Sequence, residues 1–377
     1  MDEPNYKTIE RQYSDQRQLA FAQIIPGIAE ESQAALRQLS LERVMAYGVD
    51  YADAVELRAR VQGGQRWQEV ATDLAEACLK PSRDVARETK KTRIDRLFRA
   101  SALLRMSQMM MLEDSEERTA IFTRAGLLFE EAAGLAGDRY RWTIDTQGGP
   151  LAGWMYPARD QPAVGQVLVI GGVEGWAMDF GAMGEALAAR SLDVLLLDGP
   201  GQGESRMIHH HYLTKNWVET YRQVIDSLER RAPNLPIGII GNSIGGKVVA
   251  HFAAREPRIK ACCDNGGPSF PRDYQPTFFR KMTAHVGRVS AEEAKAAWAT
   301  IDPCAPGTII SCPLLVVQGG LDPLISLADA QAIAQVGSPS DTLLIIFSDG
   351  DHCIYNHSAD KHVVIGDWMV ERLTAVQ

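Results

Sequence analysis

Long apolar runs are missing from this 377-residue chain, and no stretch reaches the roughly 20 apolar residues that a membrane-spanning helix needs. The N-terminal stretch Met1–Lys7 also lacks the apolar core of a signal peptide. Positive charge is in deficit, because 39 Lys and Arg stand against 48 Asp and Glu and leave a formal net charge of −9. This balance disfavours nucleic acid and anionic membranes as main partners. We therefore expect a cytoplasmic protein.

Cysteine is sparse, and the six cysteines show no zinc-ligand spacing. Reduced, structural thiols are the interpretation that suits a cytosolic chain. The run His209–His211 suggests a metal at first sight, but adjacent residues in a regular element cannot all face one ion. A polar loop or pocket rim explains that run better. The sequence predicts no metal and no cofactor.

The first 137 residues carry apolar side chains at helical spacing and no alternating strand pattern. Pro and Gly residues separate the segments that this periodicity predicts as helices, namely 29–47, 67–86, 94–111 and 116–136. The methionines between Met106 and Met111 fit gaps in a helix-packed core or the lining of a hydrophobic cleft. We interpret residues 1–137 as a helical N-terminal lid domain that packs over the active site.

From residue 138 onward, short apolar runs alternate with helical segments. Residues 140–145 and 151–156 flank the turn Gln147-Gly148-Gly149 and predict a hairpin. The later apolar runs predict the strands 167–170, 192–197, 237–240, 259–263, 314–317 and 343–347. Such alternation is typical of an α/β fold with a mostly parallel, buried sheet. Residues 138–377 are thus the expected catalytic domain, with a cap insertion at about 268–306 that holds helices near 278–286 and 291–300.

The most informative motif is Gly241-Asn242-Ser243-Ile244-Gly245, which follows an apolar strand and precedes a helix-like run. Strand, Gly-x-Ser-x-Gly and helix together form a nucleophile elbow, a turn so sharp that only small residues fit beside the serine. Ser243 is the candidate nucleophile. Because a serine hydroxyl alone is a poor nucleophile, this interpretation requires a base, an acid and an oxyanion site elsewhere in the chain.

Two further residues follow core strands at the positions where such a base and acid belong. His352 lies in the loop after the last predicted strand, and Asp322 lies in the loop after the strand before it. A carboxylate there would fix the tautomer of the histidine ring and stabilise its protonated form. The competing histidines, which fit worse, are His251, His285, His357 and His362, and the competing acids are Asp264, Asp349 and Asp351. Asp198, in the turn Asp198–Ser205, is assigned a structural role.

The oxyanion site requires backbone N–H groups aimed at developing negative charge, each often worth about 3 kcal/mol. One donor is expected from Ile244, the residue after the nucleophile. The other is expected from the glycine-containing loop 171–176, where Gly172 lets the backbone approach the substrate and Val173 or Glu174 donates.

The order Ser243, Asp322, His352 resembles the α/β-hydrolase superfamily. The helical N-terminal region, the Gln147-Gly148-Gly149 hairpin and the loop Gly171–Glu174 resemble one branch more closely. That branch holds 2,6-dihydroxypseudooxynicotine hydrolase, the FrsA-like esterases and the fungal polyketide-shortening hydrolases. The resemblance implies cleavage of a carbon–carbon bond next to a ketone, or of an ester, with Ser243 as nucleophile, Asp322 as acid and His352 as base. Gly171 stands where the superfamily commonly has a histidine.

Four functions compete at this point. Cleavage of a carbon–carbon bond in a 1,3-dicarbonyl or acyl-phenol substrate and hydrolysis of an ester or thioester, including polyketide chain release, use the same machinery. A peptidase of the prolyl-oligopeptidase type is disfavoured because the N-terminal region lacks the repeated strands of a propeller. A non-catalytic binding protein is disfavoured by a complete Ser, Asp and His set in the right order. The expected partner is a small-molecule substrate, and a homodimer is the assembly to test.

Overall fold

The computed structural model describes residues 4–12, 25–80, 88–269 and 276–375, and these residues pack into two compact units. Of the described residues, the larger unit contains 4–12, 142–177, 183–269 and 276–375, and the smaller, helical unit contains 25–80, 88–141 and 178–182. Among these described residues, no helix is long and apolar enough to cross a membrane.

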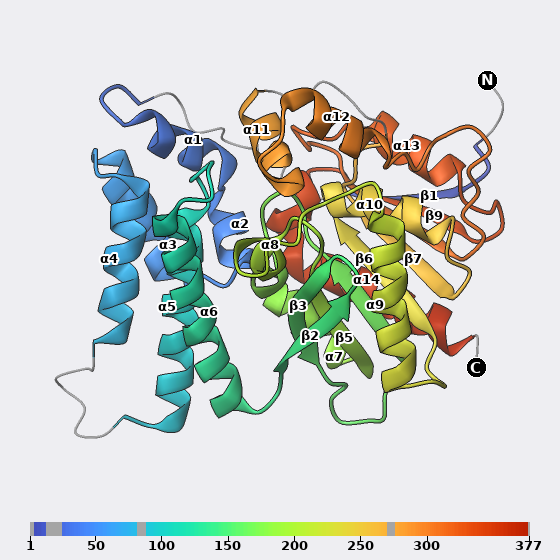
Figure 1. The fold of residues 1–377 in the computed structure, drawn as a ribbon, viewed down its shortest axis with the longest axis horizontal. Coiled ribbons are helices and arrows are strands. Elements are labelled where there is room, and N and C mark those ends of the chain that lie inside the picture. The colour runs from blue at the N-terminus through green and yellow to red at the C-terminus, as the bar shows by residue number, and fades with distance from the viewer. Residues whose placement is uncertain (1–3, 13–24, 81–87, 270–275, 376–377) are drawn as a thin grey trace. The chain divides into compact units, whose positions relative to one another are not determined.

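A nine-stranded sheet forms the centre of the larger unit, with the strand order β1-β9-β8-β7-β6-β4-β5-β3-β2 (Figure 1). From β1 to β5 along this order every neighbouring pair is parallel, and β3 joins β5 in an antiparallel pair. The strands are β1 (Lys7–Arg11), β2 (Tyr140–Thr146), β3 (Gly149–Tyr156), β4 (Gly165–Ile170), β5 (Leu192–Asp198), β6 (Ile237–Asn242), β7 (Ile259–Asn265), β8 (Leu314–Gly319) and β9 (Thr342–Phe347).

The strand order reverses at β4, which pairs with β5 on one side and with β6 on the other. Connections therefore leave the carboxyl ends of β4 and β6 in opposite directions and open a crevice between them. In open α/β sheets this switch point is where ligands bind. The loop 171–176 and Ser243 follow these two strands and consequently lie at the switch point.

Helices cover both faces of the sheet. Those beside the sheet are α7 (Gly181–Ala188), α8 (Gly203–Met207), α9 (Trp217–Arg231), α10 (Ile244–Ala253), α13 (Leu327–Gln335) and α14 (Ser358–Thr374). The inserted helices α11 (Pro276–Val286) and α12 (Ala291–Ala299) form the cap, and the 3₁₀ turns are η1 (Ala177–Phe180) and η2 (His352–His357). Gly238 of β6 packs against Met369 of α14, whereas the next residue, Ile239, belongs to the core beneath α10. Successive side chains of a strand point to opposite faces, so α10 and α14 lie on opposite faces of the sheet.

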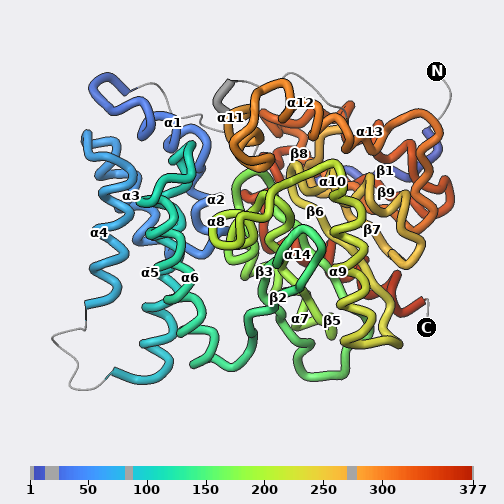
Figure 2. The backbone as a smooth tube through the Cα atoms, viewed as in Figure 1, coloured from blue at the N-terminus to red at the C-terminus, as the bar shows by residue number. Residues whose placement is uncertain are grey.

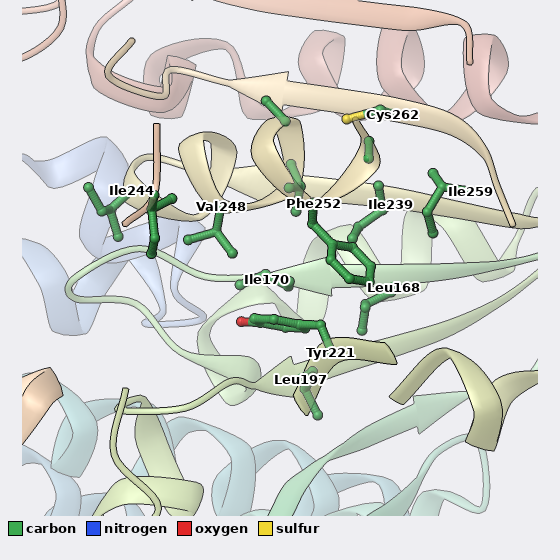
Figure 3. Close-up of a cluster of buried hydrophobic side chains, with 14 of the residues drawn as sticks. Leu168, Ile170, Leu197, Tyr221, Ile239, Ile244, Val248, Phe252, Ile259 and Cys262 are labelled. Carbon is green, nitrogen blue, oxygen red and sulfur yellow. The ribbon is translucent and has the colours of Figure 1, made fainter. Parts of the chain in front are cut away.

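The core on the α10 face joins helix and strand side chains far apart in sequence. Figure 3 shows Phe252 of α10 beside Leu168 of β4 and Ile239 of β6, Val248 of α10 directed towards Ile170 of β4, and the Tyr221 ring of α9 nearby. These side chains are almost completely buried. This packing fixes the start of α10, and therefore the position of Ser243, against β4 and β6.

The helical unit is built from α1 (Glu30–Gln38), α2 (Leu41–Ala46), α3 (Tyr51–Gln62), α4 (Trp67–Leu79), α5 (Lys90–Gln108) and α6 (Glu116–Ala136). Serine, threonine or aspartate side chains cap α2, α3, α5 and α6 at their N-termini, which satisfies amide groups that have no partner within a helix. Trp67 is buried, and its indole N–H donates to the Met106 carbonyl. Met106 and Met109 are buried, as expected of methionines in a helical core.

The prediction that the first 137 residues are helical is wrong at Lys7–Arg11, which form β1 beside β9 at the edge of the sheet (Figure 2). All five of its residues are exposed, so no buried alternation marked this strand in the sequence. The segment 29–47, expected as one helix, divides into α1 and α2 at Ser40, which caps α2, and α3 was not predicted. The end of the predicted helix 67–86 and part of the cap 268–306 fall on residues 81–87 and 270–275, outside the described residues.

Candidate active site

The turn between β6 and α10 holds Ser243 with φ 56° and ψ −127°, a strained conformation for a residue with a side chain. Neighbouring glycines make this turn possible. A Cβ atom on Gly241 would lie 2.2 Å from the Gly245 carbonyl oxygen, and one on Gly245 would lie 2.3 Å from the Gly171 carbonyl oxygen. The Ser243 N–H donates to the Asn265 carbonyl at 2.9 Å, which ties the turn to the end of β7.

Ser243, His352 and Asp322 are brought together in one hydrogen-bonded row. His352 Nε2 lies 2.9 Å from Ser243 Oγ, and His352 Nδ1 lies 2.8 Å from Asp322 Oδ2. Because an ionised carboxylate only accepts, Nδ1 carries the proton and Nε2 is free to accept from the serine hydroxyl. The other Asp322 oxygen accepts from the amides of Leu324 and Ile325, so both oxygens of this buried carboxylate are held.

Opposing effects act on the His352 ring. Its burial disfavours the charged form, but the neighbouring Cys353 sulfur and the Asp322 carboxylate favour it and outweigh burial. The pKa of His352 is consequently raised well above its ordinary value of 6.5. A carboxylate that stabilises a protonated imidazole is suited to a base that must hold a proton during the reaction.

The competing acids have other partners. Asp264 is fully buried and accepts from the Gly267 N–H, and burial raises its pKa to about 8. Asp349 pairs with His357, and Asp351 accepts from the Tyr355 N–H as the N-cap of η2. Asp198 accepts from the N–H groups of Ala177 and Glu204, which is the structural role predicted for it.

The loop after β4 presents its backbone to Ser243. A Cβ atom on Gly172 would lie 3.0 Å from Ser243 Cβ, so the loop passes directly beside the nucleophile turn. The carbonyls of Gly171 and Gly172 both accept from Gln202 Nε2 at 2.8 Å. In a trans peptide the N–H points away from the preceding carbonyl, so the Val173 N–H is directed opposite to Gln202. The Ile244 N–H, in the first turn of α10, has no acceptor within its helix.

Cap helix α11 also contacts this loop. Lys281 forms a buried ion pair with Glu174, and His285 Nε2 donates to the Val173 carbonyl at 3.1 Å. Sequence reasoning missed Gln202 and Lys281 and set His285 aside as a cap residue. These residues lie 30 or more positions from the loop residues that they contact, and no periodicity or motif links them to the loop.

The three adjacent histidines have separate surroundings. His211 Nδ1 lies 3.1 Å from the Gly149 carbonyl oxygen, and His209 lies 3.5 Å from Glu204. Within the described ranges, no cluster of three or more His, Cys, Asp or Glu side chains is arranged to hold a metal ion. All six cysteines are free.

Comparisons with known proteins bear on the fold. The profile of a family described as serine aminopeptidase, S33, matches residues 161–292, which include the nucleophile turn but not Asp322 or His352. A curated relative, 2,6-dihydropseudooxynicotine hydrolase of Paenarthrobacter nicotinovorans, is 25% identical over 353 residues, covering 89% of this chain and 92% of its own.

Solved structures show the same fold. The crystal structure of 2,6-dihydroxy-pseudo-oxynicotine hydrolase superposes with a TM-score of 0.76 at 24% identity, covering 90% of this chain and 97% of its own. AbyA5 superposes with a TM-score of 0.67 at 15% identity, covering 86% of this chain and 94% of its own.

Fold, site and comparisons together define this protein as an α/β-hydrolase enzyme. Within that class, it is similar over nearly its whole length to 2,6-dihydropseudooxynicotine hydrolase of Paenarthrobacter nicotinovorans.

Proposed function

We propose that this protein is a serine hydrolase that cleaves a carbon–carbon bond next to a ketone in a 1,3-dicarbonyl or acyl-phenol substrate. The observation that carries the proposal is the hydrogen-bonded row from Ser243 through His352 to Asp322, beside a loop with directed N–H groups. Similarity to 2,6-dihydropseudooxynicotine hydrolase supports the substrate class.

In this mechanism Ser243 Oγ attacks the ketone carbon while His352 takes the hydroxyl proton. The N–H groups of Ile244 and Val173 stabilise the oxyanion, each donor being worth about 3 kcal/mol. The carbon–carbon bond then breaks, its electron pair leaves on the carbon fragment as an enolate or aryl carbanion, and protonated His352 donates the proton to that carbon. Water, activated by His352, hydrolyses the acyl-enzyme to a carboxylic acid.

Product analysis tests this chemistry. With a 1,3-dicarbonyl panel in ¹⁸O-water, one label should enter the new carboxylate, and in D₂O the carbon that carried the broken bond should take up solvent deuterium. Efficient cleavage of esters or thioesters with every 1,3-dicarbonyl and acyl-phenol left intact would instead establish the alternative, a carboxylesterase or thioesterase.

Variants of the row test the roles of its members. Ser243→Ala and His352→Ala should each lower kcat by several orders of magnitude, and Asp322→Asn should also be severe because the wrong tautomer is favoured. Asp264→Asn is the matched control, since this buried carboxylate stands at the rival acid position. Near-normal turnover by Asp322→Asn with loss in Asp264→Asn would move the acid to Asp264.

We also propose that the enzyme is cytoplasmic and requires no cofactor. Nucleophile, base and oxyanion donors all come from the chain, so this chemistry requires no Lewis acid. Incubation with EDTA followed by desalting should leave kcat/KM unchanged. A loss that added metal restores would contradict this part of the proposal.

A further inference from the structure

We infer that helix α11 of the cap is a clamp on the oxyanion loop, with Lys281 and His285 as positioning residues. This inference rests on the proposed function, because it concerns the loop that supplies the Val173 N–H. Its components lie within the larger unit.

Three side chains hold the four loop residues 171–174. Gln202 binds the carbonyls of Gly171 and Gly172 from one side. Helix α11 supplies the contacts to the next two residues, with His285 on the Val173 carbonyl and Lys281 on the Glu174 carboxylate. Val173, the proposed donor, therefore sits between a peptide held by Gln202 and a peptide held by α11.

Burial makes these contacts more than surface pairs. The Lys281 and Glu174 side chains are only 7% and 10% exposed, and His285 is 1% exposed. Removing one member of a buried ion pair leaves the other charge without compensation, so this pair constrains the loop strongly. The His285 Nε2–H must be the donor because the Val173 carbonyl only accepts, which also fixes the ring tautomer.

Helix α11 is itself anchored to the larger unit. The His285 carbonyl accepts from the Leu213 N–H at 2.8 Å, and the Trp298 indole of α12 donates to the Met282 carbonyl at 3.0 Å. Met282 is buried in the core. A helix fixed in this way can hold the loop in one position before substrate arrives, which is what electrostatic preorganisation requires.

The test compares Lys281→Met and His285→Phe with the wild-type chain. Each variant should lower kcat for p-nitrophenyl acetate about tenfold or more, with little change in KM, because the clamp acts on the transition state. Affinity for a trifluoromethyl ketone, which forms an oxyanion on Ser243, should fall in parallel.

Two conservative variants and one control complete the test. Lys281→Arg and His285→Gln keep a hydrogen-bond donor and should recover part of the lost activity. Thr283→Val, on the same helix with its hydroxyl bonded to the Phe279 carbonyl, is the control and should match wild type.

Rates of Ser243 labelling by a fluorophosphonate separate the two hypotheses. Wild type that is not labelled at Ser243 would overturn the proposed function. Wild type that is labelled, with Lys281→Met and His285→Phe labelled equally fast and inhibited equally by the ketone, would overturn the clamp alone. If a methionine or phenylalanine variant does not fold, the Arg and Gln variants decide: slower labelling than Thr283→Val supports the clamp, and equal labelling overturns it.

Discussion

At the scale of single residues, the protonation of His352 determines when the enzyme can act. The ring must be neutral to accept the Ser243 proton, and Cys353 and Asp322 raise its pKa well above 6.5 despite burial. Activity should therefore be low at pH 6 and increase with pH, with the midpoint of the rising limb in kcat/KM displaced above 6.5. Asp322→Asn removes one stabilising charge and should shift the residual limb to lower pH. A wild-type midpoint at or below 6.5 would contradict this assignment.

The buried carboxylate of Asp264 leads to a second prediction, which concerns how the free energy of unfolding depends on pH. Burial raises its pKa from 3.8 to about 8 in the folded protein, whereas the unfolded chain retains the lower value. Between these values the folded state binds a proton that the unfolded state has released. The free energy of unfolding should consequently fall as pH rises from about 4 to about 8. Urea titrations at pH 5.5 and 7.5 should show a smaller decrease for Asp264→Asn than for wild type. An equal decrease would mean that Asp264 does not titrate in this range.

At the scale of elements, α14 holds the loop that carries His352. Lys361 of α14 is buried and donates to the Cys353 carbonyl at 2.8 Å, and its ammonium lies over the Tyr355 ring. Cys353 and Ile354 adopt φ values of 54° and 56°, which are unfavourable for non-glycine residues and worst for a β-branched one. The lysine contact thus helps to hold a strained turn directly after the base.

Replacing Lys361 should affect the positioning of His352 but not substrate binding. Lys361→Met should lower kcat at least several-fold and leave KM nearly unchanged, because the loop holding His352 relaxes while the substrate site is intact. Val363→Ala, an exposed position on the same helix, is the control for loss of helix stability. Steady-state kinetics and thermal denaturation measure both effects. A Lys361→Met enzyme with wild-type kcat would show that the strained turn keeps its conformation without the lysine contact.

Sequence reasoning predicted those strands and loops that a local hydrophobic pattern marks. The parallel strands and the positions of Ser243, Asp322 and His352 could be predicted because each residue lies in the turn or loop that follows an apolar strand. β1 was missed because a short, exposed edge strand carries no alternation. The contacts of Gln202, Lys281 and His285 with the loop could not be predicted for another reason: they form only after folding brings distant segments together. The lid role of residues 1–137 stays a prediction.

At the scale of the whole molecule, the helical unit includes a segment that continues directly from the oxyanion loop. Met178–Ala182 packs with that unit. Arg105 of α5 donates to the Met178 carbonyl at 2.9 Å and forms an ion pair with Asp179 at 3.0 Å, and both side chains are 4% exposed. Breaking a buried pair by removing one partner costs about 3–5 kcal/mol.

This arrangement predicts that activity requires the helical unit. A fragment starting at Asp138 should be inactive, and Arg105→Met in the full chain should lower both the melting temperature and kcat. Arg124→Met is the control, because its pair with Glu76 is about half exposed and such surface pairs contribute about 1 kcal/mol or less. A folded fragment from Asp138 that turned over substrate as fast as the full chain would show that the helical unit is dispensable.

The pairing of β1 with β9 has a consequence for biosynthesis. Lys7 lies beside Leu343 and Arg11 beside Phe347, so β1 can pair only after β9, the last strand of this sheet in chain order, has been made. Chain closure over so many residues is entropically costly and slow, because no local contact assists it. During translation the β1 segment therefore remains without its partner strand until β9 has been made.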